Sequence, residues 1–139
     1  MAIAFARMSI HTRSSGHSAV AGAAYRAGEK LYDERTDEIH SYKSRDDVAY
    51  SEIILPKGAN DKFSNREVLW NDVESCEKRK DAQVAKDIIL ALPKEISFKD
   101  QKELTRRFAE KHFIAHGLVA DVAIHNHHDG NPHAHIYTT

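Results

Sequence analysis

The last part of the chain concentrates residues that can bind a metal ion. Five of the ten histidines in the 139-residue sequence fall within its last fifteen residues. Side chains two apart on a strand point the same way, so His133 and His135 share one face of a predicted strand. A turn rich in Asp, Gly, Asn and Pro separates them from His125, which ends the preceding predicted strand and faces the same spot across an antiparallel pair. Three imidazoles on two strands leave coordination positions open, as a catalytic metal site requires.

The third ligand and the metal itself leave alternatives open. A lone His-x-His pair on a half-buried strand can arise by chance, and the third histidine is what favours a metal site. His127 or His128, in the turn, could replace His125 as the third ligand. Imidazole binds several divalent metals. We expect magnesium or manganese first, with zinc, nickel or cobalt as alternatives.

A tyrosine is the candidate nucleophile. Tyr25 lies in an alanine-rich segment predicted to be helical, and small residues on its face would leave room for a phosphodiester. A phenol has a pKa near 10, so at neutral pH it needs a base or nearby positive charge to attack. Tyr25 could instead pack at the edge of the core. Four other tyrosines compete for the role: Tyr32, Tyr42, Tyr50 and Tyr137.

Acidic and basic residues complete the set of candidates. Glu74 shares one face of a predicted helix with Glu77 and Asp81, and we rank it first as an acidic catalytic residue, the alternative being a solvated helix face. His40 is a candidate proton shuttle because its imidazole titrates near neutral pH. The candidate phosphate contacts are Arg7, Arg13, Arg26, Lys78, Arg79 and Lys80.

Composition describes an ordinary globular domain. Hydrophobic residues make up 41% and charged residues 29%, and the length suits one domain over residues 1–139. The net charge of -1 excludes a uniformly basic protein, although a local basic surface is enough to bind nucleic acid. The single cysteine, Cys76, excludes an internal disulfide and fits a bacterial cytoplasm. No apolar run approaches the roughly 20 residues of a membrane span, so we expect no membrane insertion.

The elements predicted to position these residues alternate along the chain. Hydrophobic patterns predict strands over residues 2–11, 48–55, 84–92, 118–125 and 133–138, and a hairpin over residues 31–42. Helices are predicted over residues 18–31, 64–80 and 97–116, with N-caps at Ser18, Ser64 and Ser97 and a capping box from Ser64 to Glu67. This order favours an α+β fold in which helices pack on a largely antiparallel sheet. Because the chain stops directly after its last strand, we expect a domain truncated at its C-terminal end.

Two motifs together resemble a known family. Residues 129–136, Asp-Gly-Asn-Pro-His-Ala-His-Ile, resemble the HUH motif of the MobA/MobL relaxases, in which two histidines flank a hydrophobic residue, here Ala134. Residues 18–31 resemble the nucleophile helix of the same family. Residues 51–56, 69–71 and 77–83 also match its pattern, so the similarity covers essentially the whole chain.

The resemblance implies an HUH endonuclease with a ferredoxin-like, palm-like antiparallel sheet and the tyrosine helix packed beside it. It implies site- and strand-specific nicking and rejoining of plasmid DNA at an origin of transfer during conjugation. Tyr25 would attack the scissile phosphate and form a 5′-phosphotyrosyl link, assisted by a metal on His125, His133 and His135. The implied partners are single-stranded DNA at the transfer origin, accessory transfer proteins, and the coupling protein with its type IV secretion system.

Other functions share parts of this pattern. An HUH replication initiator or transposase would use the same chemistry, but initiators usually place their tyrosines after the histidine motif, whereas Tyr25 precedes it. A metal-dependent hydrolase of a non-DNA substrate would use the same three histidines without Tyr25. A DNA-binding module without activity would use neither group catalytically.

Overall fold

The computed structural model describes residues 5–126 and 130–139 of the chain. Its strands are β1 (Phe5–Thr12), β2 (Lys30–Asp33), β3 (Glu38–Ser41), β4 (Val48–Ile54), β5 (Gln83–Ala91), β6 (Ala120–His125) and β7 (His133–Thr138). Its α-helices are α1 (Ala19–Ala27), α2 (Arg66–Cys76) and α3 (Phe98–His112). Each predicted helix, strand and hairpin therefore has a counterpart in the structure, although several boundaries differ.

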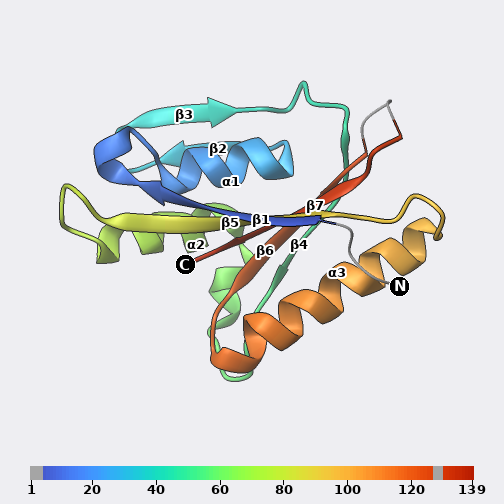
Figure 1. Ribbon diagram of the computed structural model, residues 1–139. Helices are drawn as coiled ribbons and strands as arrows, with labels where there is room; N and C mark the ends of the chain where they lie inside the picture. The colour runs from blue at the N-terminus through green and yellow to red at the C-terminus, as the bar shows by residue number, and fades with distance from the viewer. Residues whose placement is uncertain (1–4, 127–129) are drawn as a thin grey trace.

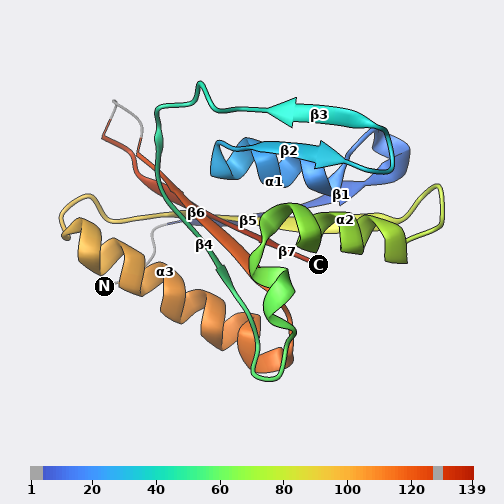
Figure 2. The ribbon, with the colours of Figure 1, turned by 180° about the vertical axis from the view of Figure 1, so that it is seen from behind.

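The main sheet is antiparallel throughout. Its strand order is β1-β5-β7-β6-β4, and each neighbouring pair runs antiparallel. The β2–β3 hairpin forms a separate two-stranded sheet. Figures 1 and 2 show α1, α2 and this hairpin on one face of the main sheet and α3 on the other. The predicted α+β fold, with helices packed on an antiparallel sheet, is confirmed.

Each face of the sheet buries its own apolar core. The core under α3 is formed largely by alternate residues of β5, β6 and β7, such as Leu90, Val122 and Ile136. On the opposite face, α1 and α2 pack over Tyr137 and Trp70, whose ring centroids lie 4.5 Å apart. Because successive strand residues alternate between faces, the histidines of β7 lie on the same side as Tyr137, under α1.

Helix α1 is bounded by residues suited to helix ends. Ser18 begins it as predicted, since its side chain accepts a backbone hydrogen bond of 3.1 Å in the first turn. Gly28 ends it in the left-handed conformation, with φ of 67°. The predicted end at Leu31 is therefore wrong, and Leu31 lies in β2. A side chain at Gly22 would place its Cβ 2.2 Å from the Tyr137 hydroxyl, so glycine is what allows α1 to lie this close to the sheet.

Helix α2 begins one residue later than predicted. Asn65, rather than Ser64, accepts the first-turn backbone hydrogen bond, at 3.1 Å. Ser64 lies instead in a short 3-10 turn that precedes the helix. Glu67 does not close a capping box, because its side chain accepts the backbone N–H of Tyr32 at 2.7 Å. The helix ends at Cys76, short of the predicted end.

Helix α3 begins as predicted and ends early. The Ser97 side chain accepts the backbone N–H of Asp100 at 3.1 Å. The helix stops at His112, and Gly117, with φ of 81°, ends the short 3-10 turn that follows. Within residues 5–126 and 130–139, no helix is long and apolar enough to cross a membrane.

Candidate active site

The three predicted metal ligands lie on one face of the sheet, at one end of β6 and β7. His125 and His133 are directly opposite each other across these strands, and His135 follows two residues later on β7. The ring centroids of His125 and His135 are 4.4 Å apart, and those of His133 and His135 are 6.3 Å apart. The alternative ligands, His127 and His128, lie outside the described residues.

Asp87 on β5 orients one of these histidines. Its carboxylate oxygens lie 3.2 and 3.3 Å from Nδ1 of His135, and Arg26 Nη2 donates to the same carboxylate at 2.8 Å. Burial alone would raise the pKa of Asp87, but hydrogen bonds from His135 and Arg26 hold it down at about 2. A histidine that donates Nδ1–H to a carboxylate presents Nε2 for coordination, which is the usual arrangement behind a metal-binding histidine.

His125 contacts the helix that carries Tyr25. Its Nε2 lies 2.7 Å from the backbone carbonyl oxygen of Arg26, to which it donates when that nitrogen carries the proton. The side chain is buried, and burial lowers its pKa to about 4. At neutral pH the imidazole is therefore uncharged, which is the form that binds a metal.

The histidines fit a divalent ion by their donor chemistry. The three imidazoles share one face of the sheet. His125 is uncharged and contacts the Arg26 carbonyl, and His135 is oriented by buried Asp87. Three protein ligands leave coordination positions open. Among the described residues, no three His, Cys, Asp or Glu side chains stand ready-made as a metal site. Binding an ion would therefore require these rings to turn toward a common point.

Tyr25 lies near the C-terminal end of α1, next to the group that contacts His125. It precedes Arg26, whose carbonyl faces His125, so the helix end and the histidines meet at the same end of the sheet. The phenol is 45% exposed, which leaves it accessible to a substrate. Tyr42 packs edge-on against it, with 5.3 Å between ring centroids, and the Arg45 guanidinium lies 4.3 Å from its ring centroid.

Glu74 does not join this group. It is buried below the other end of α1, where its Oε1 accepts the backbone N–H of Ala19 at 2.7 Å. Its Oε2 pairs with Arg13 at 2.6 Å and with Arg35 at 3.2 Å. The structure thus gives Glu74 the role of a carboxylate at a helix N-terminus, with its charge already neutralised. The prediction that it lies near the metal or the tyrosine is wrong, because spacing along α2 does not reveal which end of α1 it meets.

The predicted phosphate contacts separate into two groups. Arg13 and Arg26 are mostly buried and form ion pairs with Glu74 and Asp87, with side chains 14% and 12% exposed. The exposed members of the set are Arg7 on β1 and Lys78, Arg79 and Lys80 in the loop between α2 and β5. Figure 1 shows this loop at the opposite end of the molecule from the start of β7. Arg7 therefore remains the exposed candidate on a strand of the main sheet.

Three residues of the site were missed in the sequence: Arg45, Asp47 and Asp87. Asp87 carried a usable signal, since an acidic residue inside a strand predicted to be buried needs a partner. Arg45 and Asp47 lie in the loop between β3 and β4 and form a two-fold hydrogen-bonded pair, with distances of 2.9 and 2.6 Å. No sequence pattern marks them, because their importance comes from what the loop lies beside. His40, the suggested proton shuttle, lies in the hairpin, where its Nε2 is 3.4 Å from Oδ2 of Asp33.

A comparison with protein families agrees with this arrangement. The model of the MobA/MobL family matches residues 17–139, which include Tyr25 and all three histidines. The chain belongs to the MobA/MobL family.

Relatives of this MobA/MobL domain are named for conjugal transfer and mobilization. The chain is 40% identical to the conjugal transfer protein TraA of Rhizobium radiobacter over its full length, and covers 14% of that protein. It is 40% identical to the mobilization protein MobL of Acidithiobacillus ferridurans, covering 82% of this chain and 29% of that protein. The chain therefore spans only a small part of these curated relatives.

A solved structure shares the fold. It comes from a study of the molecular basis of vancomycin resistance transfer in Staphylococcus aureus, and is 37% identical in sequence with a TM-score of 0.93. The match covers 99% of this chain and 70% of the other. This agreement supports the relaxase-type antiparallel fold predicted for the MobA/MobL domain.

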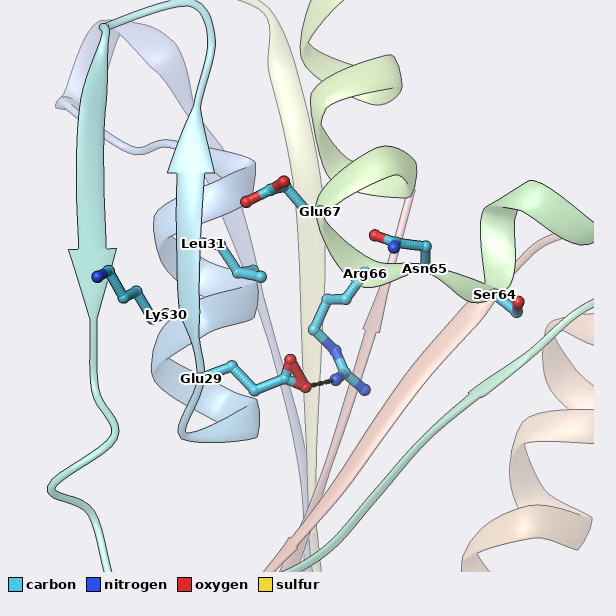
Figure 3. Close-up of a pocket in the computed structure, with 7 residues that line it drawn as sticks. All are labelled: Glu29, Lys30, Leu31, Ser64, Asn65, Arg66 and Glu67. Atoms are coloured by element: carbon cyan, nitrogen blue, oxygen red, sulfur yellow. Dashed lines mark hydrogen bonds and ion pairs between the residues drawn. The ribbon is translucent and has the colours of Figure 1, made fainter.

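A polar hollow of about 390 Å³ lies apart from the histidines, at the start of α2 (Figure 3). It is lined by Glu29, Lys30, Leu31, Ser64, Asn65, Arg66 and Glu67. The Arg66 guanidinium pairs with Glu29, as Figure 3 shows, and binds buried Asp121 at 2.8 Å. Trp70 also donates to Asp121, at 2.8 Å. Because the Arg66 guanidinium is already paired with Glu29 and Asp121, this hollow is explained by the packing of α2 on the sheet.

Proposed function

We propose that this domain nicks one strand of plasmid DNA at an origin of transfer and later rejoins it, using Tyr25 as the nucleophile. One observation carries the proposal: the carbonyl of Arg26, the residue after Tyr25, lies 2.7 Å from His125. The end of α1 that carries the accessible Tyr25 thus lies beside the face that holds His125, His133 and His135. A nucleophile and a set of metal-binding imidazoles at one place are what phosphodiester transfer requires.

The reaction exchanges one phosphodiester for another. The Tyr25 phenol loses its proton, its oxygen attacks phosphorus, and the P–O3′ bond breaks. The departing 3′ oxygen takes up a proton, and the 5′ phosphate remains esterified to Tyr25. A divalent ion held by His125, His133 and His135 would stabilise the negative charge on the phosphate oxygens. Because a phenolate is a fair leaving group, the 3′-hydroxyl can later attack the same ester and reseal the strand.

The chain's own residues keep the imidazoles ready for this role. Asp87 holds His135 through Nδ1, and burial keeps His125 uncharged at neutral pH. Arg26 links the two histidines. Its side chain binds Asp87, which holds His135, and its carbonyl contacts His125. We assign the ion as magnesium or manganese, with zinc, nickel or cobalt as alternatives.

The same proposal includes the cellular setting. The substrate is single-stranded DNA at a transfer origin in the bacterial cytoplasm, and the product complex passes to accessory transfer proteins, a coupling protein and a type IV secretion system. The names of the TraA and MobL relatives support this setting. Tyr25 lies far ahead of the histidines in the chain, which favours a relaxase over an HUH replication initiator or transposase.

Covalent capture of DNA tests the proposal. The protein is incubated with single-stranded oligonucleotides spanning transfer-origin sequences and with Mg²⁺ or Mn²⁺, and tryptic peptides are analysed by mass spectrometry. We expect a nucleotide adduct on the peptide that contains Tyr25, and its loss in Tyr25→Phe. Tyr32→Phe is the matched control, because Tyr32 is also exposed but lies in the β2–β3 hairpin. Cleavage that persists in Tyr25→Phe would instead identify a metal-dependent hydrolase.

A further inference from the structure

The loop between β3 and β4 packs against the tyrosine that the proposed function uses. The loop starts next to the end of α1, where Tyr42 N–H donates to the Glu29 carbonyl at 3.0 Å. It ends beside β6, where the carbonyl of Asp47 accepts the Asn126 N–H at 2.9 Å. Residues 42–47 therefore link the C-terminal end of α1 with the strand end that carries His125. Any residue of this loop that contacts Tyr25 can fix its position relative to the histidines.

Arg45 makes two contacts with Tyr25. Its Nη1 donates to the Tyr25 backbone carbonyl at 3.0 Å, and its guanidinium carbon lies 4.3 Å from the centroid of the phenol ring. A guanidinium at this distance over an aromatic face makes a cation–π contact. Arg45 thus holds Tyr25 at the main chain and at the ring, while Tyr42 contacts the ring edge-on.

Asp47 fixes the arginine in turn. Nε and Nη2 of Arg45 donate to the two carboxylate oxygens of Asp47 at 2.9 and 2.6 Å. The two side chains are only 16% and 13% exposed, so the pair is well shielded from water. Asp47, and after it the Tyr25 phenol, raise the pKa of Arg45, so the guanidinium keeps its charge. All three guanidinium nitrogens are thereby used, two for Asp47 and one for Tyr25.

The contact matters because the Tyr25 side chain is 45% exposed. An exposed tyrosine can change rotamer, and a nucleophile that leaves its attack position loses much of the rate gained from orientation. The ionisable groups around the phenol come from two elements. The loop supplies Tyr42, Arg45 and Asp47, and α1 supplies Arg26. His125 lies close enough to Asp47 to interact with its charge. Two of these carry positive charge, and Arg26 is farther from the ring, at 5.8 Å.

We propose that Arg45 is a positioning residue for Tyr25, which orients the phenol beside the histidines and places a fixed positive charge against it. This inference rests on the proposed nucleophilic role of Tyr25. The guanidinium packs on the ring whose phenol oxygen would attack phosphorus. Lysine could supply the charge but not the planar fork that binds Asp47 and the Tyr25 carbonyl together.

Two substitutions separate charge from geometry. Arg45→Met removes both, and Arg45→Lys keeps the charge. Arg107→Met is the matched control, since Arg107 lies on α3, is 76% exposed and pairs with Glu103 on the same helix. The environment of the Tyr25 ring is followed by NMR in protein labelled at tyrosine Cζ, with Tyr25→Phe assigning the signal. Rates of adduct formation at saturating DNA and the DNA concentration for half-maximal rate are then measured across pH.

We expect Arg45→Met to shift the NMR signal of Tyr25 Cζ, because the ring loses the guanidinium that packs against it. The adduct rate near neutral pH should fall about tenfold and recover partly as pH rises, with little change in the DNA concentration for half-maximal rate. Arg45→Lys should recover only part of the rate, because lysine keeps the charge but lacks the planar fork. Arg107→Met should match the wild type in each measurement.

Failure of this inference is distinguishable from failure of the proposed function. A Tyr25 Cζ signal and an adduct rate that stay unchanged at every pH in folded Arg45→Met would overturn the role of Arg45, even if Tyr25 still forms the adduct. Wild-type protein that forms no adduct would instead overturn the nucleophilic role, and with it this inference. If Arg45→Met does not fold, an Arg45→Lys protein with wild-type rate at every pH would contradict the need for the guanidinium fork.

Discussion

Arg26 contacts several side chains of the proposed site at once. Its carbonyl faces His125, and its guanidinium pairs with Asp87 and lies 3.2 Å from His11 Nε2. The guanidinium carbon also stacks 4.6 Å from the Tyr137 ring centroid. A change at this residue would therefore disturb the histidines and the core together, so its partners are better targets for experiments on the site.

A substitution at Asp87 tests the hydrogen bond that orients His135, without changing any of the proposed metal ligands. Asp87→Asn removes the negative charge that holds His135 and Arg26, while it keeps an oxygen that can accept a hydrogen bond. We expect Mn²⁺ affinity, measured by titration calorimetry, to fall about 10- to 100-fold, the usual effect of changing the partner behind a metal-binding histidine. The free energy of unfolding should also fall, because Arg26 is left buried without its charge partner.

Asp81→Asn is the control for this experiment. Asp81 is also an aspartate paired with an arginine, but its side chain is 62% exposed and its partner is Arg79. Exposed pairs of this kind contribute little. Equal Mn²⁺ affinity in wild type, Asp87→Asn and Asp81→Asn would contradict a ligand role for His135.

At this scale the sequence predicted the shared face of the histidines better than it predicted the partners of the charged side chains. The spacing of His125, His133 and His135 implied a shared face, and register across β6 and β7 confirms it. Arg26 was expected to contact phosphate, yet it pairs with Asp87, which lies 61 positions away in the chain. Such pairs depend on which strand lies under which helix, and no local pattern in the sequence carries that information.

Helix α1 is held at both ends by different groups. Its first turn is bound by Glu74 and by Ser18, whose hydroxyl donates to Asp33 at 2.6 Å. Its last turn is held by contacts from His125 and Arg45. The helix therefore spans the distance between a structural end and the proposed reactive end, and these two ends should respond differently to mutation.

Glu74→Gln should affect stability and leave the chemistry intact. The amide keeps an oxygen for Ala19 N–H but leaves Arg13 and Arg35 without the buried charge that neutralises them. We expect the free energy of unfolding, measured in urea, to fall by about 3 kcal/mol. The rate of adduct formation per folded molecule should stay close to that of the wild type, because Glu74 lies at the other end of α1 from Tyr25.

Glu77→Gln provides the comparison, since Glu77 is exposed at the end of α2. It should change neither stability nor rate. A Glu74→Gln protein that is stable but forms the adduct much more slowly would restore Glu74 as a catalytic residue.

The ends of helices were harder to predict than their presence. Ser64 and Asn65 are adjacent and both can cap a helix, so the sequence alone does not choose between them. Gly28 could have ended α1 in the prediction, because a left-handed C-cap favours glycine. Leu31 instead continued the apolar pattern from the helix into β2, and this continuity concealed the boundary.

For the molecule as a whole, the order of elements predicted the layers but not the order of strands. Alternating helices and strands with short turns implied helices on an antiparallel sheet, and this is what is found. The placement of β5 between β1 and β7 brings Asp87 beside the histidine strand. Nothing in the composition of β1 or β4 marks them as edge strands, so this arrangement required the structure.

The acid stability of the whole domain should reflect two groups of buried side chains. Burial lowers the pKa of His11 and His125 to about 4 in the folded protein, against about 6.5 when unfolded. Between these values the unfolded chain binds more protons, so stability is complete above pH 6.5 and is lost as pH falls toward 4. Asp47 is held at a pKa of about 2 mainly by Arg45, and Asp87 also lies at about 2, so their contributions are lost only below about pH 4.

Urea unfolding midpoints of the metal-free protein should be measured from pH 7 to 3, for the wild type and for histidine variants. They should separate the histidine contribution above about pH 4 from the aspartate contribution below it. His11→Gln should flatten the decline between about pH 6.5 and 4 and leave the decline below about pH 4 unchanged. His116→Gln should follow the wild type at each pH, because His116 is exposed in the turn after α3. A wild-type midpoint that stays constant from pH 7 to 5 would mean that these imidazoles gain a proton without opening the fold, and that burial does not hold His125 in its metal-binding form.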